Sequence, residues 1–240
     1  MSNPVVAVVL AAGIGSRFDP QEPKQLVSIL KKPIVCWSIE SFERNANVSD
    51  IIVVVNSVVR KHVESLIEEC QYSKVRCVIN GGKERVDSTL AALQLLQDQH
   101  IPHDAKILIH DGVRPFISQE VIDNCVRILD EYDAATVAIP STDTILLTRT
   151  NERNNDIIQN VPERTQTFRA QTPQVFRFHT IRDAYILAAK DPQFHPTDDT
   201  RVVVDYMPQV QVGIVQGSES NIKITTRADI PVATQIAQTL

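Results

Sequence analysis

Short apolar runs rich in β-branched residues alternate along this chain with longer segments of helical periodicity. We interpret six of the apolar runs as strands, at 5–10, 51–55, 75–79, 106–109, 135–139 and 210–215. The helical segments lie at 34–44, 58–70, 86–97, 119–130, 181–189 and 228–238. This alternation is typical of βαβ units, in which helices cover both faces of a mostly parallel sheet. It predicts a Rossmann-like α/β fold, with Asp87 or Ser88 capping one helix and Ser118 another.

The segment 141–169 interrupts the alternation. It holds a Thr-rich alternating run, a polar stretch at 149–156 and a second apolar run at 157–161. This pattern favours a β-hairpin that projects from the sheet as an arm. The length of 240 residues fits one large α/β unit, and no linker or repeat divides it. We therefore expect a single domain over 1–240 with an arm that serves oligomerisation.

Composition argues against several classes of protein. The formal net charge is -5, so the chain has no general basic field for binding nucleic acid. Apolar stretches all fall short of the roughly 18 residues that span a membrane. The four cysteines are scattered without a CxxC pair, which favours reduced thiols. We expect a cytoplasmic protein that binds neither nucleic acid nor a membrane.

Glycine is scarce, and its placement is informative. Seven glycines occur, whereas an average chain of this length would hold roughly 17 at about 7%. Five of them follow the carboxyl ends of predicted strands, where ligands bind in open α/β sheets: Gly13, Gly15, Gly81, Gly82 and Gly112. Glycine there lets backbone amides approach a ligand closely.

The first glycine turn has two cations behind it. Arg17 and Lys24 can place two positive charges against a triphosphate whose oxygens meet the amides of Gly13 and Gly15. A dinucleotide fingerprint would need glycine or alanine at Phe18, and the P-loop pattern is absent. An ordinary glycine turn with solvated cations stays open as an alternative.

Later segments carry further groups suited to a nucleotide. Ser88 follows the glycine pair at 81–82 and can hold a base or ribose, although an ordinary capped turn would look the same. An apolar strand delivers Asp111 to the sheet edge, where a carboxylate can hold Mg²⁺ together with substrate phosphates. Arg114 precedes a proline and can bind an acceptor phosphate. Lys223 stands in an apolar stretch, where it reaches either the surface or an anion.

Two other residue patterns are set aside. His110 fits a packed histidine better than a ligand, and no HExxH or CxxC pattern suggests zinc. A nicotinamide-dependent oxidoreductase would need an acidic residue after the second strand, where Asn56 stands.

Taken in order, these stretches resemble the polyol-phosphate cytidylyltransferases, whose branches act on 2-C-methyl-D-erythritol 4-phosphate or D-ribitol 5-phosphate. The matching stretches are 10–25, 81–88, 110–116, 143–144, 171–174, 197–199 and 221–225. The resemblance implies a nucleotidyltransferase that joins CMP from CTP to a polyol phosphate and releases pyrophosphate. Methylerythritol phosphate, for isoprenoid precursors, is the preferred acceptor. Ribitol phosphate, giving CDP-ribitol for cell-surface polymers, is the alternative, and a non-catalytic nucleotide-binding protein is a remote one.

The resemblance also implies roles for single residues. Arg17, Lys24 and Lys223 would stabilise the transition state, and Asp111 would coordinate Mg²⁺ or another divalent cation. The implied CTP-binding residues are Ala11, Ala12, Gly13, Gly15, Gly82, Ser88 and Asp111. The implied acceptor-binding residues are Arg114, Thr144, Arg164 and Thr172. In the family, the arm forms a homodimer in which Thr144 and Arg164 reach toward the neighbour's acceptor phosphate.

Some positions depart from the family pattern. Ile145 follows Asp143-Thr144, where methylerythritol enzymes often have lysine, and the surroundings of Arg164 look more like the ribitol branch. Lys83 stands where an acidic or small residue is common, so no role is carried over to it. These departures leave the acceptor open between the two branches.

Overall fold

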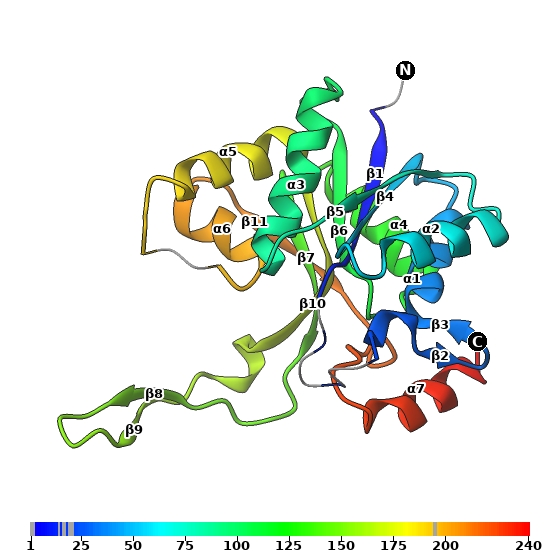
Figure 1. Cartoon of the computed structure of the whole chain (residues 1–240). Helices are drawn as coiled ribbons and strands as arrows, with labels where there is room; N and C mark the ends of the chain where they lie inside the picture. Colours follow the sequence, from blue (N-terminus) through cyan, green and yellow to red (C-terminus); the bar gives the residue numbers. More distant parts are fainter. Residues whose placement is uncertain (1–2, 14, 16–17, 19–21, 194–195) are drawn as a thin grey trace.

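A seven-stranded sheet forms the centre of the protein (Figure 1). The structure is a computed structural model, and it describes residues 3–13, 15, 18, 22–193 and 196–240. The sheet order is β11-β7-β10-β6-β1-β4-β5. Its strands are β1 (Val5–Ala11), β4 (Asp50–Val55), β5 (Val75–Asn80), β6 (Lys106–Asp111), β7 (Ala134–Pro140), β10 (Phe168–Arg177) and β11 (Val212–Gln216). Only β10 runs antiparallel to its neighbours in this sheet. The predicted mostly parallel sheet is therefore confirmed.

Helices cover both faces of the sheet (Figure 1). They are α1 (Ile34–Glu43), α2 (Arg60–Glu69), α3 (Arg85–Asp98), α4 (Gln119–Ile128), α5 (Phe178–Ala188), α6 (Asp199–Tyr206) and α7 (Asp229–Ala237). Successive side chains of β1 point to opposite faces, so Ala7 and Val9 pack with α1, α2 and α4, while Val6 and Val8 pack with α3, α5 and α6. Burial on both faces explains why β1 is a continuous apolar run.

Short elements complete the fold beside the carboxyl edge of the sheet. They are η1 (Lys24–Leu26), β2 (Ser28–Ile29), β3 (Lys32–Pro33) and η2 (Arg164–Gln166). A third apolar cluster there joins Ile29 of β2, Ile34 of α1 and Ala233 of α7. This cluster brings the end of the chain against its beginning, so residues far apart in sequence meet at one edge of the sheet.

The predicted arm is a hairpin of β8 (Leu147–Thr150) and β9 (Asp156–Asn160), which pair antiparallel and project from the body (Figure 1). The hairpin prediction is confirmed. Large apolar side chains on and beside it are exposed, namely Ile145, Leu146, Leu147, Ile158, Val161 and Phe168. Along the described part of the chain, no helix has the length and apolar character needed to cross a bilayer.

Two helix starts test the cap predictions. Ser118 caps α4 by accepting a hydrogen bond from the Val121 amide, as predicted. The predicted cap of α3, Asp87 or Ser88, was wrong by three or four residues, because Glu84 is the N-cap and Asp87 lies at the third helical position. The Asp87 carboxylate accepts a hydrogen bond from the Glu84 amide at 3.0 Å, which completes a capping box.

Candidate active site

One pocket opens where the carboxyl ends of β1 and β6 meet the start of α3. In the pairing of β1 with β6, Leu10 lies opposite Asp111. We call this hollow the central pocket; it is lined by Leu10, Ala11, Ala12, Gly13, Lys24, Gln25, Gly82, Lys83, Glu84, Arg85, Ser88, Asp111, Val113 and Lys223. The structure therefore brings together eight predicted site residues, from both ends of the chain.

Two predicted residues of the first turn need separate mention. Gly15 does not line the central pocket, but it lies beside the Lys24 side chain and has a φ of 69°, in the left-handed region that favours glycine. Arg17 lies outside the described residues. Its expected catalytic role stays a prediction.

The second glycine turn is shaped by close packing against α3. A Cβ atom on Gly81 would overlap the Ser88 hydroxyl, and one on Gly82 would overlap the Asp87 side chain. Glycine at both positions lets the turn fold back on the helix start, with Ser88 buried and its hydroxyl donating to the Glu84 carbonyl at 3.3 Å. The backbone at Gly82 is thus part of the pocket wall.

Asp111 is the electrostatic centre of the pocket. Its Oδ2 atom lies 2.8 Å from Lys223 Nζ and 3.9 Å from Arg114 Nε, and its Oδ1 atom lies 3.2 Å from Arg85 Nε. Burial raises the pKa of this carboxyl, but Arg85, Lys223 and Arg114 outweigh burial and hold the pKa well below its usual range. Asp111 is therefore ionised at neutral pH.

Arg85 links Asp111 to a second buried carboxylate. Its Nη1 atom lies 2.6 Å from Asp199 Oδ2, and the Tyr185 hydroxyl donates to Asp199 Oδ1 at 2.6 Å. Burial lowers the pKa of Arg85, yet Asp199 and Asp111 together raise it above its ordinary value. Sequence reasoning gave Arg85 no role, because Lys83-Glu84-Arg85 has the pattern of a solvated charge run.

Behind Asp111, His110 and Thr172 are buried and bonded to each other. His110 Nδ1 lies 3.0 Å from Thr172 Oγ1, and its Nε2 lies 2.9 Å from the Arg114 carbonyl. Thr172 Oγ1 also accepts a hydrogen bond from the Asp111 amide at 3.0 Å. His110 is thus the packed histidine that was predicted. The Thr172 hydroxyl is occupied behind Asp111, a placement that favours a supporting role over the predicted acceptor contact.

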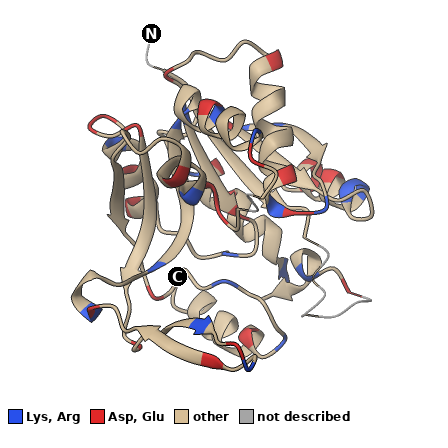
Figure 2. Cartoon of the chain, turned by 90° about the vertical axis from the view of Figure 1, so that its left-hand side faces the viewer, with Lys and Arg blue, Asp and Glu red and all other residues tan. Residues whose placement is uncertain are grey.

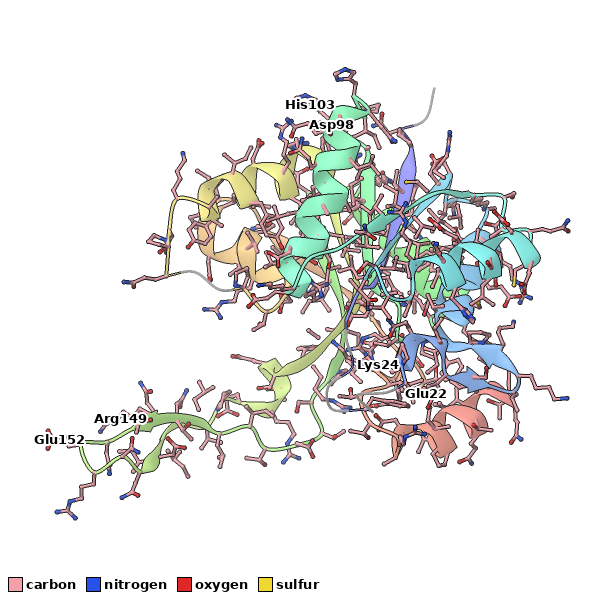
Figure 3. The ribbon with its side chains drawn as sticks, viewed as in Figure 1. Glu22, Lys24, Asp98, His103, Arg149 and Glu152 are labelled. Atoms are coloured by element: carbon pink, nitrogen blue, oxygen red, sulfur yellow. The ribbon has the colours of Figure 1, made fainter. Side chains whose placement is uncertain are left out.

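Lys24 reaches the same edge of the sheet from the start of the chain. Its Nζ atom donates to the Ile224 carbonyl at 3.3 Å, next to Lys223. Figure 3 shows Lys24 near the carboxyl end of the sheet, well away from Arg149 and Glu152 at the tip of the arm. Figure 2, which turns the left-hand side of Figure 1 toward the viewer, shows basic and acidic residues interspersed over that side. The cations around Asp111 form a local cluster of three.

A second hollow, which we call the side pocket, adjoins the central pocket through Lys223. It is lined by Arg114, Ile139, Arg169, Ala170, Gln171, Glu219, Asn221, Ile222 and Lys223, and its volume is about 280 Å³. Its charged groups are three cations and Glu219, which pairs with Arg169 at 2.7 Å. The local excess of positive charge suits an anion.

The other two predicted acceptor residues lie in the arm. Arg164 Nη2 donates to Thr144 Oγ1 at 3.1 Å, and both side chains are exposed. Neither residue lines the central or the side pocket of its own chain. Within one chain, therefore, the structure brings Thr144 and Arg164 to each other and not to the remaining predicted site residues.

The pocket offers few ligands for a metal ion. Among the residues that the structure describes, no three His, Cys, Asp or Glu side chains gather in a metal-binding group. Asp111 and Glu84 are the carboxylates of the central pocket. Because each oxygen of a carboxylate has two lone pairs, Asp111 keeps acceptor capacity beside its cations. This donor set fits a Mg²⁺ ion that takes most of its ligands from phosphates and water.

Comparison with known proteins gives one family. Residues 5–239 match the family described as 2-C-methyl-D-erythritol 4-phosphate cytidylyltransferase. A protein of that name from Bifidobacterium longum is 63% identical over 98% of this chain and 80% of its own length. A bifunctional ribulose 5-phosphate reductase/CDP-ribitol pyrophosphorylase from Haemophilus influenzae is 37% identical over 98% of this chain and 48% of its own length. The crystal structure of 4-diphosphocytidyl-2C-methyl-D-erythritol synthase from Anaerococcus prevotii superposes with a TM-score of 0.82 at 25% identity, covering 98% of this chain and 96% of the other.

His110 predicts a pH dependence of stability. Burial lowers its pKa from 6.5 to about 4, so below pH 6.5 the unfolded chain binds more protons than the folded chain. The free energy of unfolding is therefore unaffected by His110 above pH 6.5. It falls by about 3 kcal/mol as the pH drops from 6.5 toward about 4. Urea unfolding across this window should therefore show a shallower pH slope in His110→Asn than in the wild type.

The exposed His62 on α2 provides the matched control, and His62→Asn should keep the wild-type slope. Equal slopes for the wild type and His110→Asn would contradict the assignment.

Proposed function

This chain belongs to the 2-C-methyl-D-erythritol 4-phosphate cytidylyltransferase family, and we infer that its central pocket transfers CMP from CTP to 2-C-methyl-D-erythritol 4-phosphate. An oxygen of the acceptor phosphate attacks the α-phosphorus of CTP. A new P–O bond forms, the bond from the α-phosphorus to the bridging oxygen breaks, and pyrophosphate leaves with the electron pair. The observation that carries this proposal is the ionised Asp111, held by cations in the pocket that the glycine turns line.

The nucleoside of CTP occupies the enclosed part of the central pocket. Backbone groups of Ala11, Ala12 and Gly82 contact the cytosine, with help from Ser88. Support comes from the glycine turn that packs on Ser88 and exposes the wall backbone at Gly82. The pocket volume of about 150 Å³ is below the roughly 300 Å³ of common ligand sites. It is too small for the whole of CTP, so the phosphates extend past Gly13 toward the lysines.

Lys24 and Lys223, with Arg17, stabilise the charge that develops on the α-phosphate in the transition state. Such stabilisation comes from preorganised charges and needs no covalent intermediate. Support comes from the hydrogen bond that Lys24 Nζ donates to the carbonyl of Ile224, the residue after Lys223. Both lysines also line the central pocket. Amides at Gly13 and Gly15 supply further donors to the phosphates.

Asp111 would hold the Mg²⁺ ion that accompanies CTP. Such an ion would supply positive charge that neutralises the phosphates and polarises the phosphoryl oxygens. The retained acceptor capacity of Asp111 supports this role. Lys223 is paired with Asp111 in the structure, and a phosphate oxygen offers its ammonium group an alternative partner.

The acceptor phosphate enters through the side pocket. Lys223 lines both pockets, so an anion in the side pocket lies next to the CTP phosphates. Arg114 and Arg169 supply the other positive charges there. The H. influenzae relative, with CDP-ribitol pyrophosphorylase in its name, keeps D-ribitol 5-phosphate as the alternative acceptor.

The arm joins two copies of the chain into a homodimer and carries Arg164 and Thr144 toward the acceptor phosphate of the neighbour. Contiguous exposed apolar side chains commonly mark protein interfaces. The six exposed apolar residues of the arm support such an interface. The bond between Arg164 and Thr144 keeps the guanidinium in place on the arm for a phosphate.

An acceptor assay tests the proposed function. The purified protein with CTP and Mg²⁺ should release pyrophosphate with 2-C-methyl-D-erythritol 4-phosphate, and far more slowly with D-ribitol 5-phosphate or glycerol 3-phosphate. Turnover with ribitol phosphate alone would assign the chain to the other branch. Absence of turnover with all three acceptors would contradict the proposed reaction.

The lysines act on the transition state more than on the ground state. We expect Lys24→Ala to lower kcat by about 100-fold or more while the KM for CTP changes only a few-fold, because removing one preorganised donor costs about that much. Steady-state kinetics measure both constants. Lys61→Ala, at an exposed site on α2, is the control. A kcat equal to the wild type in Lys24→Ala would rule out the role.

A shared site makes Arg164 depend on the neighbour. Arg164→Ala should raise the KM for the acceptor by about tenfold, through the loss of a charge-assisted bond to phosphate. Mixed dimers of Arg164→Ala and Lys24→Ala subunits should regain activity, because one of the two sites then has both groups intact. Arg153→Ala, at the exposed tip of the arm, is the control. Failure of the mixed dimers to regain activity would exclude sharing.

A further inference from the structure

Lys223 is held by a segment without regular secondary structure. Residues 217–224 connect the end of β11 to the region before α7 and contain no helix or strand. Two buried side chains flank the lysine, since Asn221 is 1% exposed and Ile224 is 0% exposed, whereas the Lys223 side chain is 42% exposed. With no helix or strand to fix its backbone, the place of Lys223 depends on these two anchors.

Asn221 ties the segment to β10 and to the loop after β6. Its Nδ2 atom donates to Gln171 Oε1 at 3.2 Å and to the Thr172 carbonyl at 3.0 Å, both on β10. Its carbonyl accepts a hydrogen bond from Arg114 Nη1 at 2.8 Å, just after β6. Thr172 in turn binds the Asp111 amide. One asparagine thus links the backbone near Lys223 to the backbone that carries Asp111.

Gln171 binds the same segment at a second point, through a hydrogen bond. Its Nε2 atom donates to the Ser218 carbonyl at 2.8 Å. A Cβ atom on Gly217 would overlap Gln171 Oε1, so glycine at 217 lets the segment approach β10 this closely. Gln171 and Asn221 are both buried. We call these two side chains and the bond between them the polar latch; that bond is buried and so protected from water.

Ile224 fixes the opposite side of Lys223. Its amide donates to the Val113 carbonyl at 2.9 Å, and its side chain packs in the apolar cluster with Phe116 and Ala233. The polar latch at Asn221 and this apolar anchor therefore hold Lys223 from its two sides. Between these two anchors, Lys223 lies 2.8 Å from Asp111.

We propose that Asn221 is a positioning residue that fixes Lys223 at the reacting phosphate and affects catalysis only through that lysine. The inference rests on the role proposed above for Lys223. Asparagine suits the place because its amide supplies donors to two acceptor oxygens. Aspartate, of the same shape, would place a buried carboxylate against those oxygens.

A double-mutant cycle tests the inference. Asn221→Ala should lower kcat by about tenfold or more with little change in the KM for CTP, because a displacement of about 1 Å can cost about 100-fold. In a Lys223→Ala background, adding Asn221→Ala should cause no further loss of kcat. Ser220→Ala, next to Asn221, is the control and should keep the wild-type kcat in both backgrounds.

The outcomes separate the two proposals. If Lys223→Ala alone keeps the wild-type kcat, the proposed role of Lys223 fails. If Lys223→Ala is impaired but Asn221→Ala costs the same factor in both backgrounds, Asn221 acts independently and the inference is overturned. Should Asn221→Ala fail to fold, Gln171→Ala removes the latch from the β10 side, and the same loss of effect in the Lys223→Ala background is required.

Discussion

The arrangement of the site depends on one buried carboxylate. Asp111 meets Arg85 from the start of α3, Arg114 from the loop after β6, and Lys223 from the segment before α7. Without its negative charge, three cations would lie close together with little water to separate them, at a large electrostatic cost. The carboxylate thus makes it favourable for these segments to converge. Lys223, one of these cations, lines both pockets.

The backbone of Asp111 is fixed as firmly as its side chain. Its amide is bound by Thr172, which is itself bound by His110. These buried polar groups are satisfied by one another, as buried polar groups must be. They require β10 to lie directly beside β6. The antiparallel strand inserted into an otherwise parallel sheet is therefore the element that supplies Thr172 and Gln171 to the site.

The sequence predicted those parts of the fold that rest on continuous apolar runs. β1, β4, β5, β6 and β7 were found to within two residues at each end. Four of them, β1, β4, β6 and β7, are largely buried, whereas β5 lies at the edge of the sheet and is only partly buried. β10 was missed because its middle holds Pro173, a residue that argues against a central strand. α6 was also missed, because it has only eight residues and includes three consecutive valines, which favour strands. In both elements, burial decided by distant partners overrides the local pattern.

In the site, too, the local pattern was informative and the distant contacts were not. Glycine turns and strand ends identified the residues that line the central pocket, but not the buried residues that hold them in place. Arg85 and Asn221 gain their roles from partners 26 and 50 residues away, Asp111 and Gln171. No spacing in the sequence reports such contacts.

The net charge of the chain was equally uninformative about the site. A net charge of -5 suggests a poor receptor for a triphosphate, yet charges beyond about 8–10 Å are largely screened at physiological ionic strength. The phosphates therefore respond to the cations gathered at Asp111, which carry a local excess of positive charge whatever the rest of the surface holds.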